Sequence, residues 1–155
     1  MLLQMLTIAD YGGLRPDRTL DLIRAGQVAI MVPDARPVIT RSIAFQLLFT
    51  AHELDGVSRT VRLIIKAPNG ESVGSVEAGL DLPAIDLTVD PEDGDVARFP
   101  TAAAYSVALE FEESGEYLLE LHLDDETIGS HRFVVLRVPT PEFPAVEVVG
   151  QSNQQ

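Results

Sequence analysis

Apolar and polar residues alternate with a period of two along most of this chain. Residues 57–66, 105–112 and 116–124 each place apolar side chains on one parity and mostly polar side chains on the other. Because successive side chains of a β-strand point to opposite faces, each run predicts a strand with one buried face. Shorter runs at 28–32 and 43–49 follow the same pattern. No apolar stripe of useful length at the helical period of 3.6 residues competes with this interpretation.

Turn-forming residues separate these runs. Asn69-Gly70 is a strong hairpin signal, residues 124–126 join the last two strands, and residues 10–13 are interpreted as the turn that closes the first strand. The expected strands, about eight in number, lie near residues 2–9, 19–25, 27–32, 41–53, 57–67, 71–79, 102–112 and 116–138, the last being a hairpin. Regularly spaced short strands predict an all-β fold, namely a single antiparallel β-sandwich, immunoglobulin-like or C2-like.

Two segments depart from the alternation. Residues 80–100 contain three prolines and six acidic residues before Arg98, which predicts a long acidic loop with a short strand at 85–89. Residues 139–155 contain three more prolines and a polar end. Because 155 residues are typical of one domain, we expect a single sandwich domain over residues 1–138 and a Pro-containing C-terminal tail over residues 139–155.

Charge and composition narrow the function classes. The chain has 24 Asp and Glu against 11 Lys and Arg, a net charge of −13, which argues against nucleic acid or an anionic membrane as a partner. It has no cysteine, so disulfides and thiolate chemistry are excluded. No stretch approaches the roughly 20 apolar residues of a membrane helix, and Asp10 interrupts the apolar start where a signal peptide would continue. We therefore expect a cytoplasmic location.

Three segments together resemble a known family. Residues 6–11 form a strand that ends in Ala-Asp-Tyr, residues 16–26 form a turn and a strand that ends in Ala-Gly, and residues 114–130 have the order Gly-x-Tyr strand, Asp-rich turn, Ile-Gly-Ser. The combination resembles a family of small bacterial immunoglobulin-like or C2-like β-sandwich proteins, classed only as a domain of unknown function. The resemblance spans roughly residues 1–138. Asp17-Arg18 stands where the family typically has Asp-Gly. The resemblance implies a sandwich and carries no catalytic residues.

The acidic loop contains the candidate metal ligands. Calcium prefers six to eight oxygen ligands, often supplied by flexible loops. Six acidic residues lie between residues 81 and 95, and the ones that we select as candidate calcium ligands are Asp90, Glu92, Asp93 and Asp95. Their spacing does not match an EF-hand. The alternative, which we favour, is a solvated acidic loop.

A second metal hypothesis concerns the last hairpin. A turn centred on Asp125-Glu126 would place Glu120 opposite His131, with His122 diagonal to it on the same face, and this trio would suit zinc. A bulge or a one-residue shift would send His131 to the other face. We favour solvated polar positions, and we expect no cofactor.

Residues 70–74 match the nucleophile-elbow motif Gly-x-Ser-x-Gly, with Ser72 at its centre. That elbow works at a turn from a strand into a helix, and here the motif enters a predicted strand. We interpret the match as a coincidence, so a Ser72 hydrolase ranks third among the functions, and we expect no enzyme.

The tail offers a functional hypothesis. Residues 143–149 are apolar and nearly uncharged, and they could add as a strand to the sheet edge of another subunit; the alternative is a frayed terminus or an edge strand of its own domain. The sequence thus predicts a non-catalytic binding or assembly module that acts through sheet edges, the acidic loop or the tail. A protein partner or self-association is expected, with a possible homo-oligomer through an edge strand or the tail. The alternative function is a calcium- or ligand-binding sandwich that uses loop 81–95.

Overall fold

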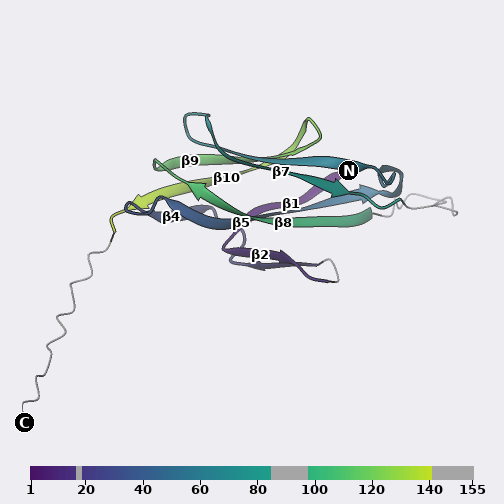
Figure 1. Ribbon diagram of the computed structural model, residues 1–155, viewed down its shortest axis with the longest axis horizontal. Helices are drawn as coiled ribbons and strands as arrows, with labels where there is room; N and C mark the ends of the chain where they lie inside the picture. Colours follow the sequence, from purple (N-terminus) through teal and green to yellow (C-terminus); the bar gives the residue numbers. More distant parts are fainter. Residues whose placement is uncertain (17–18, 85–97, 141–155) are drawn as a thin grey trace, which may run out of the picture.

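The computed structural model describes residues 1–16, 19–84 and 98–140, and over these residues the protein is all-β (Figure 1). The described part contains one 3₁₀ turn and no α-helix. In chain order the elements are β1 (Leu2–Ala9), β2 (Tyr11–Leu14), β3 (Leu20–Ile23), β4 (Ala29–Pro33), β5 (Val38–Thr50), η1 (Ala51–Glu53), β6 (Ser58–Lys66), β7 (Ser72–Asp81), β8 (Arg98–Glu110), β9 (Gly115–Leu123) and β10 (Glu126–Val138).

These strands form three sheets. A five-stranded sheet has the order β4-β10-β9-β6-β7, a three-stranded sheet has the order β1-β5-β8, and β2 and β3 form a separate hairpin. All strand pairs are antiparallel except β4 and β10, which run parallel. The all-β class and the largely antiparallel pairing are therefore confirmed. The single, purely antiparallel arrangement of about eight strands is corrected to three sheets with one parallel pair.

The extra strand is β2, which occupies residues interpreted from the sequence as a turn. Tyr11–Leu14 pairs with Leu20–Ile23, and Figure 1 shows this hairpin below the three-stranded sheet. A β-carbon on Gly12 would lie 3.1 Å from Ser42 Cβ and 3.4 Å from Ala104 Cβ. A residue without a side chain is favoured at position 12 because the hairpin crosses β5 and β8 closely.

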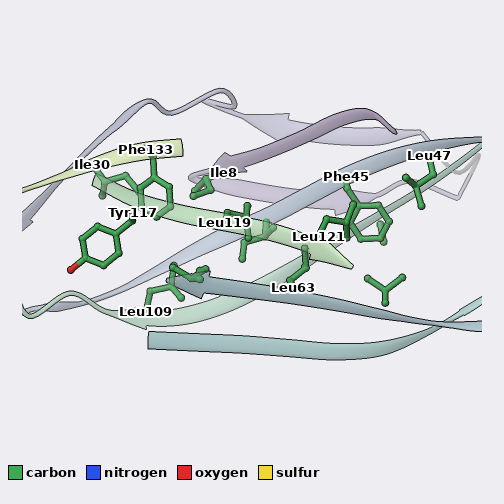
Figure 2. Close-up of a cluster of buried hydrophobic side chains, with 14 of the residues drawn as sticks. Ile8, Ile30, Phe45, Leu47, Leu63, Leu109, Tyr117, Leu119, Leu121 and Phe133 are labelled. Atoms are coloured by element: carbon green, nitrogen blue, oxygen red, sulfur yellow. The ribbon is translucent and has the colours of Figure 1, made fainter. Parts of the chain in front are cut away.

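One hydrophobic core lies between the two larger sheets. The apolar parity of the sequence is the buried one: Leu63 of β6 and Leu119 of β9 are at most 1% exposed, and the polar residues of the same strands face outward. Figure 2 shows side chains of both sheets in this cluster, among them Phe45 from the three-stranded sheet. Burying a side chain of this size contributes about 1.5–3 kcal/mol, so this alternation supplies most of the driving force for folding.

Aromatic rings close one end of the core. Phe111 lies edge-on to Tyr117 with the ring centres 5.1 Å apart, and Tyr117 stacks on Phe133 at 5.7 Å. The Tyr117 hydroxyl donates a hydrogen bond of 3.0 Å to the Glu113 carbonyl, so its polar group is satisfied while the ring remains buried. These contacts anchor β9 and β10, the strands that carry the sites described next.

Candidate functional site

The last hairpin does not bring together the trio that the sequence suggested for zinc. Glu120 pairs with Ser130, and His131 pairs with Leu119, and the register shifts between Thr127 and Gly129. At this irregularity the end of the Leu3 side chain fills the space that a side chain on Gly129 would take, so a larger residue there would have to displace Leu3. His131 instead lies 3.1 Å through its Nε2 from the Gln27 carbonyl oxygen. The predicted Glu120–His131 pairing is therefore wrong, because the turn lies at Asp124-Asp125, one residue earlier than predicted, and the bulge offsets only half of the resulting change in register.

A different polar network does form on the outer face of the five-stranded sheet. Lys66 Nζ lies 2.8 Å from Glu120 Oε2, and His122 Nε2 lies 3.2 Å from the same oxygen. Thr127 Oγ1 lies 3.1 Å from His122 Nδ1. The Glu120 and His122 side chains are only 15% and 16% exposed. The network thus ties β6, β9 and β10 together through one largely buried carboxylate.

The electrostatics of this network centre on Glu120. The hydrogen bond from Lys66 is the main reason that the pKa of Glu120 lies below its ordinary value; burial opposes this effect, and the hydrogen bond to His122 adds to it. A carboxylate with a lowered pKa stays charged over a wider pH range, so the ionic link to Lys66 is maintained in mildly acidic solution.

The order hydroxyl, imidazole, carboxylate in this network is also that of a nucleophile, its base and an orienting acid. Acyl transfer needs in addition preorganised donors for the oxyanion, and the described contacts place none beside Thr127. Glu120 is moreover shared with the Lys66 ammonium group. Within the described ranges no group of three or more His, Asp or Glu side chains could hold a metal ion. We therefore interpret the network as a link between strands.

The other residues selected from the sequence fall elsewhere. Asp90, Glu92, Asp93 and Asp95 lie outside the described residues, as do residues 141–155 of the tail, so the calcium site and the division into domain and tail stay predictions. Ser72 is the exposed first residue of β7, opposite Lys66 in β6. Its strand continues to Asp81, so the motif around Ser72 does not lead into a helix.

A feature that sequence reasoning missed is a polar cluster at Asp10, which was assigned to a simple turn. The Asp10 carboxylate accepts a hydrogen bond of 2.7 Å from Gln27 Nε2, and Arg24 and Arg41 lie 3.3 Å and 3.4 Å from its oxygens. The Gln27 hydrogen bond is the main cause that lowers the pKa of Asp10. Because Gln27 also contacts His131, this cluster holds the chain where it enters β4.

The outer face is apolar where β4 pairs with the last five residues of β10. Met31 is opposite Leu136 in the parallel pair, and Ala29 is opposite Val134. All four side chains are exposed: Met31 by 68%, Leu136 by 45% and Val134 by 37%. We call Ala29, Met31, Val134 and Leu136 the β4–β10 patch. Alternating residues of the same two strands are buried in the core, so the patch adds a second apolar surface to strands that already have one.

No protein-family model matches this chain, and a comparison with curated proteins gives no match. Among solved structures, the chain is similar to the Pseudomonas fluorescens alkylpurine DNA glycosylase AlkC bound to DNA containing an abasic site analog. The TM-score is 0.39 with 15% sequence identity, and the similarity covers 86% of this chain and 30% of that chain. This chain therefore spans less than a third of that glycosylase.

These findings correct the function expected from the sequence. The similar structure is a DNA-bound enzyme, which contradicts the prediction of a non-catalytic binding or assembly module and does not support the predicted absence of a nucleic-acid partner. We do not retain that function or the alternative functions given with it; the four candidate calcium ligands stay an untested prediction. A likeness at this TM-score assigns no activity to this chain. The described part contains no helix with the length and apolar character needed to cross a membrane. The cytoplasmic location stays a prediction.

Proposed function

We propose that this chain acts as a homodimer in which the β4–β10 patch of one copy packs against the same patch of a second copy. The observation that carries the proposal is the exposure of Met31, Val134 and Leu136 side by side on one sheet face. Contiguous apolar surface on a protein marks a place where another surface docks. Burying a side chain such as Met31 contributes about 1.5–3 kcal/mol, which favours association over continued exposure.

The distribution of charge around the β4–β10 patch is compatible with a second copy as the partner. The whole chain carries −13, so two copies repel each other over most of their surfaces. The charged side chains that flank the patch are paired within the chain: Arg132 with Glu116, and Arg137 with Asp34 at 3.0 Å. This region is thus locally neutral. Two acidic copies can therefore approach each other most closely at this region.

We propose that the two larger sheets form an immunoglobulin-like sandwich. Two features support this: both sheets contribute to a single hydrophobic core, and the short β4 lies parallel to the last strand at the edge of the five-stranded sheet. In such a sandwich the β4–β10 patch lies on an outer sheet face, where it is open to a partner.

The dimer is tested by the mass of the protein in solution. Static light scattering over about a hundredfold range of concentration should show a dimer of the unaltered chain, and Met31→Asp should shift it to a monomer, because the dimer would bury an unpaired charge. The matched control is Ile23→Asp, which changes an apolar residue of similar exposure (55%) on the β2–β3 hairpin and should leave the dimer intact. A monomer at every concentration, or dissociation by the control alone, would refute the proposal.

A further inference from the structure

A cavity opens between the two larger sheets, on the side where β7 and β8 face each other. Its volume is about 250 Å³. The strands β7 and β8 are edge strands of different sheets, so no ladder of hydrogen bonds closes the space between them. The residues that line it include Ile43, Leu63, Ile65, Gly74, Val107 and Leu109. The cavity is open to solvent at Ser75 and Ala108. We propose that it binds a small, uncharged molecule with an apolar body.

Two small residues of β7 face the core, and one of them, Gly74, lines the cavity. Gly74 is opposite the buried Ile65 of β6, and Ala78 is opposite the buried Val61. Strands that fill a core normally carry larger side chains at such positions. A β-carbon on Gly74 would lie 3.3 Å from Leu109 Cδ2, so even one methyl group would meet the opposite wall. Glycine at this position therefore allows Leu109 to pack closely against β7 at the edge of the cavity.

The lining decides the class of ligand. It consists of aliphatic side chains, one glycine, one alanine and Ser75, and it includes no charged side chain. A charged ligand would lose its hydration there without gaining a partner, which is costly. Figure 2 shows Leu63 and Leu109 among the buried side chains of the core, so the cavity is continuous with the apolar interior. An uncharged molecule is the occupant that this surface favours.

The volume limits the size of the ligand. Apolar cavities of about 150 Å³ bind benzene, whereas sites for larger drug-sized molecules measure about 300–1,000 Å³. A cavity of about 250 Å³ therefore suits a molecule of roughly ten non-hydrogen atoms, by proportion to benzene. Naphthalene has this size and is uncharged and fluorescent, so it is a suitable probe.

The experiment titrates naphthalene into the full chain and follows its fluorescence, with ¹H–¹⁵N chemical shifts to locate it. Saturable binding with shifts in β7 and β8 is expected. Gly74→Val should weaken binding by about tenfold or more, because its side chain would displace Leu109 and reshape the cavity that both residues line. The control Gly79→Val lies on the same strand but on the opposite parity, where a β-carbon would meet only Ser58 Oγ at 3.5 Å, and it should bind like the unaltered chain.

Two further measurements keep the test decisive. If Gly74→Val does not fold, Gly74→Ala replaces it and should weaken binding by a smaller factor. Naphthalene-2-sulfonate, which adds a charge, should bind about tenfold more weakly than naphthalene. Equal binding of the two probes, equal loss in the Gly74 and Gly79 variants, or no saturable binding would overturn the proposal. Met31→Asp should bind naphthalene normally, so this test is independent of the homodimer.

Discussion

The two ends of the five-stranded sheet differ on their outer face while sharing one core. At the β6–β9 end, outward side chains are tied by ionic contacts, such as Lys66 with Glu120 at 2.8 Å and Arg62 with Glu77 at 3.0 Å. At the β4–β10 end, the outward side chains are apolar, and Met31 is 68% exposed. The ionic end satisfies its polar groups within the chain. The apolar side chains of the other end are removed from water only when another surface covers them, which is why we assign the partner to that end.

The largest expected effect comes from the core that both ends share. Leu119 is fully buried in β9, the strand between the ionic and apolar ends. Leu119→Ala should lower the free energy of unfolding by about 2–5 kcal/mol, because it removes apolar contacts and leaves a cavity. Denaturant unfolding at low protein concentration measures this change. The control Leu118→Ala, a half-buried residue on the outer face, should cost clearly less. Equal losses would mean that the two faces are not distinguished as described.

A smaller effect is expected at the ionic end. Glu120→Gln removes the charge that Lys66 and His122 share, and it should cost about 1–2 kcal/mol, since hydrogen bonds to charged groups exceed neutral ones. The control Glu77→Gln removes an ion pair of greater exposure with Arg62 and should cost less than about 0.5 kcal/mol. Equal costs in both variants would show that the burial of Glu120 has no energetic consequence.

The contribution of Glu120 to the free energy of unfolding should depend on pH in a defined direction. The pKa of Glu120 is lower in the folded protein than its ordinary value, so its contribution to stability is fully present above the ordinary pKa of a glutamate. It disappears as the pH falls through the folded-state pKa, because the carboxyl group is then protonated in both states. The difference in unfolding free energy between the unaltered chain and Glu120→Gln should therefore shrink on acidification. A difference that grows at low pH would contradict this assignment.

Local alternation predicted most of the strands. Tyr117, Leu119 and Leu121 are buried as their parity required, and the Asn69-Gly70 turn joins β6 to β7, with Gly70 at a φ of +86°. These features depend on residues that are adjacent in the chain, so they can be predicted from the sequence alone. The sequence-based bounds of β1 at residues 2–9 agree with the structure for the same reason.

The errors arose where distant segments meet. Gly12 was assigned to a turn, but it is small because β5 and β8 pass beside it. Gly129 accommodates a contact with Leu3. The Glu120–His131 error is the exception and is local, because the turn of the last hairpin lies one residue earlier than predicted. The parallel pairing of β4 with β10 joins residues about a hundred positions apart, so no local sequence pattern predicts it. The β4–β10 patch and the cavity beside Gly74 were missed because both depend on such long-range pairing.

The smallest expected effect on folding lies in the β4–β10 patch itself. Met31→Ser changes a side chain that makes few contacts within one copy, so at low concentration the free energy of unfolding should stay within about 0.5 kcal/mol of the unaltered chain. At high concentration the unaltered chain should gain stability by mass action, because dimer formation favours the folded state, and Met31→Ser should gain less. Thermal unfolding at both concentrations measures this. If Met31→Ser lost stability equally at both concentrations, the exposed methionine would contribute to folding of the single chain, and the contrast between the apolar and ionic ends would fail.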